Sequence, residues 1–281
     1  MSKETVLVIG LGEVRRPLFE LLSECGSFSV FGYDINTDKT REAGANEPPS
    51  EVDVMHICIP CHSQKDFVDH VVNYVGRFKP ELMIINSTVP PGTTEKVHIK
   101  CGGHIAHSPV RGVHKSLNHM KKELKRWTKY VGGVNVRSAE LAKRHFEKTG
   151  LKVKIMSSPL ETELAKLFET TYRAWMIACF QEMHRISRRF KADFDEIVDF
   201  LEDTHLVRLD RPVMFPSVIG GHCLIPNAEL LLESYDSEFL RLLLKSNEKR
   251  KEEIKEEGVM EEVEKIRKRT QNLERKLLKT R

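Results

Sequence analysis

The sequence predicts an α/β protein in which a doubly wound parallel sheet is followed by an all-α central domain and a charged C-terminal helix. Three observations predict this fold. Short apolar runs alternate with helical stretches between residues 5 and 156, a pattern typical of parallel strands joined by crossover helices. Residues 159–190 have no strand character and are apolar on almost every side near their middle. Residues 251–281 consist largely of Lys, Arg and Glu, so we expect three parts, at residues 1–156, 157–250 and 251–281.

Length and composition indicate an ordinary globular protein. The 281 residues provide enough chain for one large domain or two modest ones, and the formal net charge is only +4. No apolar window is long enough to cross a bilayer, and no signal leader precedes the first strand, so we expect a cytoplasmic protein that does not bind membranes. The six cysteines are expected to be reduced thiols.

Hydrophobic periodicity places the individual elements. Strands are expected at residues 5–9, 28–33, 52–59, 82–85, 103–107, 130–131 and 152–156, and helices at residues 16–25, 64–75, 138–149, 159–190 and 193–201. A polar helical stretch is also expected after residue 114. Ser158 before Pro159, with Glu161 in the first turn, is a helix start signal, and it puts the first domain boundary near Met156.

The first turn has the pattern of a dinucleotide-binding βαβ unit, which makes the sheet Rossmann-like. The turn between the first strand and the first helix consists of Gly10, Leu11, Gly12, Glu13, Val14 and Arg15. Two glycines at these positions form the tight turn and admit a pyrophosphate, and an acid about 20 residues on accepts ribose hydroxyls. Asp34 is that acid, and its charge would repel a 2′-phosphate, which favours NAD over NADP. Arg15 occupies the place of a third glycine, and the alternative is a plain strand-to-helix turn.

The carboxyl ends of parallel strands are where ligands bind in such sheets. Pro60 follows the third strand, and Ser87 and Thr88 follow the fourth. We therefore expect these three residues on the ligand-binding edge of the sheet.

Two clusters have the composition of a zinc site. His56, Cys58, Cys61 and His62 form one, and Cys101, His104 and His107 the other. His56 and Cys58 alternate on an expected strand, and no second ligand pair follows at zinc-finger spacing. We therefore predict no metal site.

A candidate nucleophile lies far from the cofactor turn, in residues 218–223. Gly220 and Gly221 permit backbone conformations with positive φ and a close approach of a ligand. Cys223 follows them, and the neighbouring His222 favours its thiolate. The alternative is that Cys223 is a small buried hydrophobic residue, which is the usual state of a free cysteine.

The charged tail carries a short heptad stripe. Its members are Val259, Val263, Ile266, Thr270, Leu273 and Leu277. Such a stripe packs against a partner helix or against the body of its own chain. The alternative is a solvated or frayed surface helix. The mixed charge signs exclude a basic arm that binds nucleic acid.

Six motifs in order resemble the UDP-glucose/GDP-mannose dehydrogenase family over residues 5–247. They are Gly10-Leu-Gly-Glu-Val with Pro17, Tyr33-Asp34-Ile-Asn, Ser87-Thr-Val-Pro-Pro-Gly-Thr, Ser108-Pro, Glu163-Leu-Ala-Lys166-Leu and Gly220-Gly-His-Cys-Leu. The resemblance implies NAD-dependent oxidation of an alcohol on a nucleotide sugar, through an aldehyde and a thioester, to a carboxylate. It also implies that Cys223 is the nucleophile, that Lys166 stabilises oxyanions or orients water, and that Thr88 and Pro60 line the nicotinamide site. The helix at residues 161–190 would form the core of a homodimer.

The sequence departs from the family at positions that handle water and its proton. Val110 replaces the glutamate after Ser-Pro, and His114 stands at a second acidic position nearby. Thr170 replaces an asparagine, and Asn227 replaces an aspartate. We also expect no counterpart of the family's third, nucleotide-sugar-binding domain, because the charged tail is short and repetitive. Hydride transfer can still occur, whereas thioester hydrolysis, which needs an activated water, is in doubt.

Three functions remain open on the sequence alone. The first is a divergent NAD-dependent dehydrogenase with a sugar-like or nucleotide-sugar substrate. The second is a hydroxyacid-type dehydrogenase that uses Lys166 as acid and base, with Cys223 incidental. The third is a non-catalytic dinucleotide-binding or scaffold protein whose tail recruits a partner. The candidate catalytic residues are Cys223, Lys166, His222, Asn227 and Thr170.

Overall fold

The computed structural model describes residues 3–12, 16–112, 116–221 and 223–279. The chain divides into two compact units, Met1–Lys166 and Leu167–Arg281. Helix α7 (Pro159–Phe190) begins in the first unit and continues into the second. Among the described residues, no helix is both long enough and apolar enough to span a membrane.

The first unit is built on one sheet of seven strands in the order β2-β1-β3-β4-β5-β6-β7. All neighbouring strands are parallel except β5 and β6, which are antiparallel. The strands are β1 (Glu4–Ile9), β2 (Phe28–Tyr33), β3 (Val54–Ile57), β4 (Leu82–Ile85), β5 (His104–His107), β6 (Lys129–Gly133) and β7 (Val153–Met156). The helices are α1 (Arg16–Glu24), α2 (Thr37–Glu42), α3 (Gln64–Phe78), α4 (Thr93–Cys101), α5 (Leu117–Arg126) and α6 (Val136–Glu147). The predicted α/β fold with a mostly parallel, Rossmann-like sheet is confirmed.

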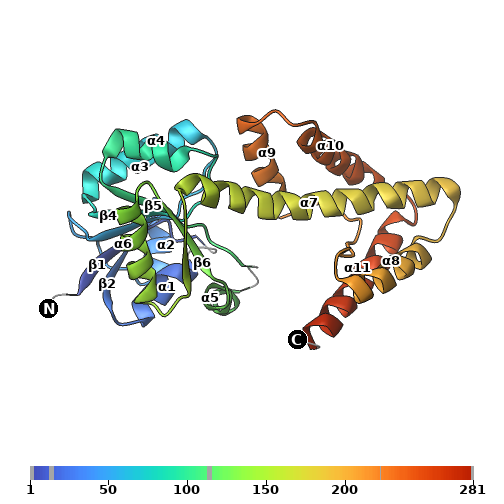
Figure 1. Ribbon diagram of the computed structural model, residues 1–281, viewed down its shortest axis with the longest axis horizontal. Coiled ribbons are helices and arrows are strands. Elements are labelled where there is room, and N and C mark those ends of the chain that lie inside the picture. The colour runs from blue at the N-terminus through green and yellow to red at the C-terminus, as the bar shows by residue number, and fades with distance from the viewer. Residues whose placement is uncertain (1–2, 13–15, 113–115, 222, 280–281) are drawn as a thin grey trace. The chain divides into compact units, whose positions relative to one another are not determined.

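Helices cover both faces of this sheet (Figure 1). One face packs against α3 and α4, and the other packs against α1, α5 and α6. Side chains alternate between the two faces along each strand. In β1, Val6 and Val8 belong to one core cluster, and Leu7 and Ile9 belong to the other. This double burial explains why the strands appear in the sequence as unbroken apolar runs.

The structure corrects several expected boundaries. Helix α6 begins at Val136 rather than Ser138, because the Asn135 side chain accepts a hydrogen bond from the Ser138 N–H and caps the helix. Helix α8 (Phe194–Arg208) continues beyond the expected end at residue 201. Strand β3 is shorter than expected. Helices α2 and α4 were not predicted; α2 buries no residue and therefore lacks an apolar stripe.

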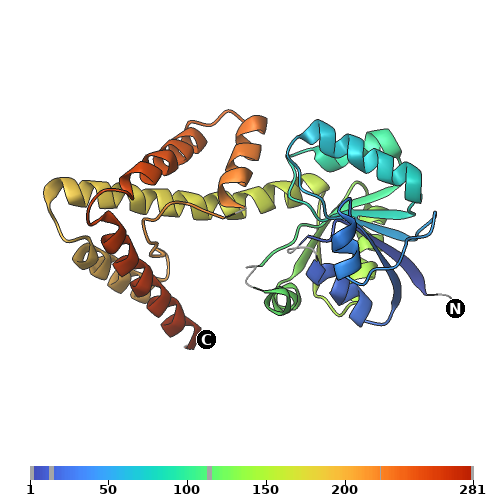
Figure 2. The same cartoon turned by 180° about the vertical axis from the view of Figure 1, so that it is seen from behind.

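The second unit is entirely helical within the described residues. After the greater part of α7 come α8, α9 (Leu224–Ser234), α10 (Glu238–Glu253) and α11 (Val259–Lys279). In the two views, α9 and α10 lie on one side of α7, and α8 and α11 lie on the other (Figures 1 and 2). The predicted division into domains ending at residues 156 and 250 stays a prediction.

The heptad stripe of the tail packs on its own unit. Ile266 and Leu273 of α11 share a core cluster with Phe180 of α7 and with Phe194 and Val198 of α8. The stripe residues Val259, Val263 and Thr270 are buried as well, and Leu277 is partly buried. The body of the same chain therefore covers the stripe, which is one of the two packing modes expected from the sequence, and a separate partner helix or a solvated helix does not describe this face.

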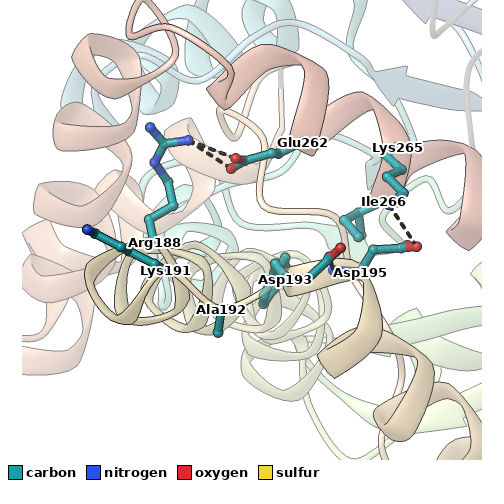
Figure 3. A pocket seen from close by; sticks show the side chains of 9 residues that line it. Arg188, Lys191, Ala192, Asp193, Asp195, Glu262, Lys265 and Ile266 are labelled. Carbon is teal, nitrogen blue, oxygen red and sulfur yellow. Dashed lines mark hydrogen bonds and ion pairs between the residues drawn. The ribbon is translucent and has the colours of Figure 1, made fainter.

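Ion pairs add to this packing at a pocket of about 460 Å³ between the α7–α8 turn and α11 (Figure 3). Glu262 of α11 accepts two hydrogen bonds of 2.9 Å from Arg188 of α7, and Lys265 lies 3.2 Å from Asp195 of α8. Arg269 pairs with Asp195, Asp199 and Glu202 on α8. Two ion pairs among the residues that line this pocket, Arg188–Glu262 and Lys265–Asp195, thus hold α11 in place.

Candidate active site

The turn after β1 is shaped for close approach of a ligand. Gly10 has φ +92°, and a Cβ atom there would lie 2.7 Å from the Cys58 carbonyl oxygen, so the turn requires glycine. A Cβ atom on Gly12 would meet nothing within 4 Å, so the space beside this backbone is open. The first turn of α1 carries no acidic side chain that would repel an anion. The predicted residues Glu13, Val14 and Arg15 lie outside the described residues.

Asp34 holds its carboxylate beside this turn. It follows β2, and its Oδ2 accepts a hydrogen bond of 2.8 Å from the Leu11 N–H, while Oδ1 accepts one of 2.9 Å from the Asn36 N–H. Each carboxylate oxygen keeps a further lone pair for a ligand hydroxyl. The Leu11 side chain is buried in the core, so only its backbone faces Asp34. The described residues of the turn therefore fit a dinucleotide whose phosphates lie against Gly12 and whose ribose lies against Asp34.

Ser87 joins the carboxyl ends of β3 and β4. Its hydroxyl donates a 2.5 Å hydrogen bond to the Ile59 carbonyl, and its own carbonyl accepts one of 3.0 Å from His107 Nε2. Burial lowers the pKa of His107 to about 3, so this imidazole is neutral. Thr88 is half-buried and Pro60 is exposed. The structure thus brings the three predicted edge residues to the ends of two adjacent strands.

Glu163, in the first turns of α7, caps the start of α4, a role that no local sequence signal indicates. Its carboxylate accepts hydrogen bonds from the Gly92 N–H (2.6 Å), the Thr94 N–H (2.8 Å) and the Thr94 hydroxyl (2.6 Å). Gly92 is the N-cap of α4 and has no side chain to cap it, so Glu163 supplies the missing acceptors. Burial raises the pKa of this carboxyl. The contact fixes the start of α7, where Lys166 follows three residues later.

A second residue missed by the sequence analysis is the buried Lys129 of β6. Its Nζ donates hydrogen bonds to the Ser108 carbonyl (2.8 Å) and the Pro109 carbonyl (3.1 Å). Burial lowers the pKa of this amine to about 7. Lys129 therefore supports the backbone of the Ser108-Pro motif from inside the protein, and a lysine in a short polar segment gave no signal of this.

Cys223 lies at the start of a helix in the second unit. It is the N-cap of α9, follows Gly221 with φ +86°, and its side chain is exposed. The alternative of a buried thiol is therefore excluded. Cys223 thus lies where the partial positive charge of the helix N-terminus is located. The predicted neighbour His222 lies outside the described residues.

Thr170 and Asn227 contact each other within the second unit. Asn227 Nδ2 donates a 3.0 Å hydrogen bond to Thr170 Oγ1, and the Thr170 hydroxyl donates one of 2.9 Å to the Leu167 carbonyl. Both side chains are buried. A hydroxyl and an amide do not take a proton from water at neutral pH, so this pair contains no general base.

The candidate residues belong to two units. The cofactor residues and Lys166 are in the first unit, and Thr170, Cys223 and Asn227 are in the second. Within the described part of the chain, no three His, Cys, Asp or Glu side chains are grouped as metal ligands. His56 and Cys58, which resembled part of a zinc site, are both buried in the first unit.

Comparisons with known proteins give the relationship. Residues 160–249 match the model of the UDP-glucose/GDP-mannose dehydrogenase family, central domain. A UDP-N-acetyl-D-mannosamine dehydrogenase of Methanocaldococcus jannaschii is 30% identical over 260 residues, covering 78% of this chain and 59% of the relative. That of Methanococcus vannielii is 27% identical over 285 residues, covering 87% and 65%. The chain thus spans about three fifths of the length of the first of these relatives.

Solved structures share the fold. A UDP-D-ManNAc dehydrogenase from Pyrococcus horikoshii superposes with a TM-score of 0.71 at 23% identity, over 88% of this chain and 68% of that one. A 3-hydroxyisobutyrate dehydrogenase from Mycobacterium tuberculosis has a TM-score of 0.66 at 15% identity, over 95% and 100%. The resemblance drawn from the motifs is confirmed: residues 160–249 match the central-domain model of the UDP-glucose/GDP-mannose dehydrogenase family, and 78% of the chain is similar to a UDP-N-acetyl-D-mannosamine dehydrogenase.

Proposed function

We propose that this protein is an NAD-dependent oxidoreductase that acts on the CH–OH group of a nucleotide sugar, in the cytoplasm and as a homodimer. The observation that carries the proposal is the exposed thiol of Cys223 at the N-terminus of α9. It lies within the residues that match the family's central domain, whose relatives are named UDP-N-acetyl-D-mannosamine dehydrogenases. The substrate class is therefore a UDP-linked N-acetylated hexose.

The first unit supplies the cofactor site. The backbone at Gly10 and Gly12 takes the pyrophosphate, and Asp34 takes the ribose hydroxyls and opposes the 2′-phosphate of NADP. Pro60, Ser87 and Thr88 border the nicotinamide. When bound there, NAD would supply the acceptor for the hydride that leaves the substrate carbon in each oxidation.

The chain's own residues handle the substrate oxygen and carbon. Lys166 stabilises the negative charge on the substrate oxygen as its proton leaves. The Cys223 thiolate then attacks the aldehyde carbon, and the new C–S bond gives a thiohemiacetal. Loss of a second hydride from that carbon gives a thioester on Cys223, and water must cleave the C–S bond to release a carboxylate and the thiol.

This last step lacks a carboxylate base at the positions of Val110, Thr170 and Asn227. Val110 has no proton acceptor, and the Asn227 amide is engaged with Thr170. Loss of a positioned general base typically slows a reaction by about 10²- to 10⁴-fold. We therefore propose that the thioester is hydrolysed slowly and that oxidation stops early or leaves an adduct on Cys223.

The test is a substrate panel with the purified full-length chain. We expect NADH formation with UDP-N-acetylmannosamine and its aldehyde, and none with 3-hydroxyisobutyrate. Cys223→Ser should abolish aldehyde turnover, because a serine hydroxyl is scarcely ionised at neutral pH. Cys179→Ser is the matched control, since Cys179 is the other exposed cysteine among the described residues, and it should retain activity.

A hydroxyacid-type dehydrogenase is the second candidate. The absence of a carboxylate in the Thr170–Asn227 pair favours it, because a single alcohol oxidation needs no hydrolytic water. Lys166 would then act as acid and base, with Cys223 incidental. Full activity of Cys223→Ser on a hydroxyacid would support this candidate and exclude the first.

A further inference from the structure

A chain of hydrogen-bonded side chains crosses the first unit from the start of β1 to the end of β5. Glu4 Oε1 lies 2.9 Å from His145 Nδ1, and His145 Nε2 lies 2.9 Å from His56 Nε2. His56 Nδ1 lies 2.8 Å from Asn86 Oδ1, and Asn86 Nδ2 lies 2.7 Å from the Ser108 carbonyl oxygen. These residues come from five separate elements or their ends, up to 141 residues apart in the sequence.

This series of hydrogen-bonded side chains begins at the amino end of β1 and ends just beyond the carboxyl ends of β4 and β5. Glu4 is the first residue of β1, whereas Asn86 and Ser108 directly follow β4 and β5. The intervening imidazoles are buried, with His56 0% and His145 2% exposed. His145 also stacks on Phe28 at 4.7 Å. No water is therefore needed to connect the two edges through these side chains.

The Ser108 carbonyl sets the direction of every bond in the chain. A carbonyl only accepts, so the Asn86 amide nitrogen faces it, and Asn86 Oδ1 faces His56. His56 Nδ1 must then carry a proton, and this N–H donates a hydrogen bond to Asn86 Oδ1. Burial lowers the pKa of His56 well below its usual range, so this imidazole is neutral and its Nε2 is an acceptor.

The hydrogen-bond directions at His56 and Glu4 also fix the roles of the two ring nitrogens of His145. His145 Nε2 must donate a hydrogen bond to the unprotonated His56 Nε2. Its Nδ1 faces Glu4, and although burial alone would raise the pKa of this carboxyl, hydrogen bonds and charge from His145 and Lys148 lower the pKa to about 2. A carboxylate only accepts, so His145 Nδ1 is protonated as well. In this arrangement His145 donates from Nε2 to His56 and from Nδ1 to the Glu4 carboxylate.

At the Ser108 end of this series, the hydrogen bonds hold the backbone that borders the proposed cofactor site. The Ser108 carbonyl accepts from both Asn86 Nδ2 and Lys129 Nζ, and the Ser108 hydroxyl donates a 2.7 Å bond to the Tyr130 carbonyl. Asn86 is followed directly by Ser87 and Thr88. A rotation of the Asn86 amide would place its oxygen against the Ser108 oxygen, and the two loops after β4 and β5 would separate.

We propose that His56 and His145 are positioning residues for the oxidation: His145 holds His56 in the tautomer that donates to Asn86 Oδ1, and this bond keeps the Asn86 amide nitrogen on the Ser108 carbonyl and the loops after β4 and β5 in register at the nicotinamide end of the site. This proposal rests on the proposed function, because it takes that edge as the place of hydride transfer. It assigns no contact between either histidine and the substrate.

The first arm of the test needs no activity. Nitrogen NMR of the histidine side chains in the parent protein distinguishes protonated from unprotonated ring nitrogens. At pH 7 we expect His145 to be protonated on both nitrogens and His56 on Nδ1 alone. In Glu4→Gln, the glutamine amide donates to His145 Nδ1, so we expect that nitrogen to lose its proton while His56 keeps its tautomer. A neutral His145 in the unsubstituted chain, or His56 protonated on Nε2 alone, overturns the proposal.

The second arm separates positioning from folding and from cofactor affinity. His56→Phe fills the site with an aromatic ring but breaks the chain, and we expect kcat to fall by at least about tenfold with the Kd of NADH unchanged. Glu4→Gln keeps the bond direction at Asn86 and should retain kcat. Unchanged kcat in His56→Phe contradicts the proposal. If His56→Phe does not fold, the NMR arm decides. A chain that binds no NADH contradicts the proposed function instead, and the NMR arm is unaffected.

Discussion

At the residue scale, burial determines the protonation of the polar groups near the proposed cofactor edge. His56, His107 and Lys129 all have pKa values lowered mainly by loss of hydration. For each group, hydrogen bonds to backbone or amide oxygens, rather than a carboxylate, compensate for the lost hydration. These groups are therefore uncharged or easily deprotonated supports of the site.

Lys129 gives a pH dependence of stability whose sign follows from its shift. Its pKa is about 7 in the folded chain, against 10.5 for a hydrated lysine in the unfolded chain. Between these pH values the unfolded chain binds a proton at Lys129 that the folded chain does not. The contribution of Lys129 to the free energy of unfolding therefore rises with pH across this range and is lowest below pH 7. We expect a contribution on the order of 4 kcal/mol. Denaturant midpoints at pH 7 and pH 10 should show this rise in the parent and a smaller one in Lys129→Met. Equal rises in both contradict the assignment.

Asp34 gives a prediction on cofactor choice. Asp34→Ala removes the acceptor for the ribose hydroxyls, so NADH should bind at least about tenfold more weakly. It also removes the charge that opposes a 2′-phosphate, so the ratio of the Kd for NADPH to the Kd for NADH should decrease. Asp53→Ala is the matched control, because Asp53 likewise accepts a backbone hydrogen bond, from the Thr5 N–H at the opposite edge of the sheet. Calorimetric titration measures both. An unchanged NADH affinity in Asp34→Ala rules out this role.

At the element scale, α11 belongs to the core of the second unit. We expect Ile266→Ala and Leu273→Ala each to cost about 2 to 5 kcal/mol of unfolding free energy, since both side chains are buried against α7 or α8. Met260→Ala on the same helix is the control, because this side chain is exposed, and it should change stability by less than about 0.5 kcal/mol. Removing residues 258–281 should unfold the second unit, as followed by circular dichroism. A stable truncated chain would show that α11 is an accessory.

The elements show where prediction from sequence succeeds. The start of α7 depends on neighbours in the chain: Leu160 N–H donates to Ser158 Oγ at 3.1 Å, and Ser158 Oγ donates to Glu161 at 2.5 Å. Those signals are local and were predicted. The Glu163 cap on α4 joins residues about 70 apart, and the His56–His145 contact joins residues 89 apart. No local pattern specifies such partners, so the glycine turn and Cys223 could be proposed as site residues from the sequence, whereas the Glu163 cap and the His56–His145 contact could not.

At the scale of the whole molecule, exposed apolar side chains on α7 and α8 support the proposed dimer. Phe190 is 78% exposed and Phe200 76%, and Tyr172 and Val207 are also exposed. We expect light scattering to give a dimer and Phe200→Asp to shift it towards monomer, because a charge there opposes burial. Ile99→Asp is the control, since Ile99 of α4 is 76% exposed but belongs to the first unit. A monomeric parent chain refutes the dimer.

The central claim is that Cys223 takes part in NAD-dependent oxidation and that release of the product is slow. The most direct measurement is intact-protein mass spectrometry after incubation with NAD and UDP-N-acetylmannosamine, with NADH and product counted in the same sample. We predict a covalent adduct of the substrate's acyl group on Cys223, absent from Cys223→Ser, or a single NADH per substrate consumed. Two NADH per carboxylate released at steady state with no adduct would show that hydrolysis is intact and would contradict this account.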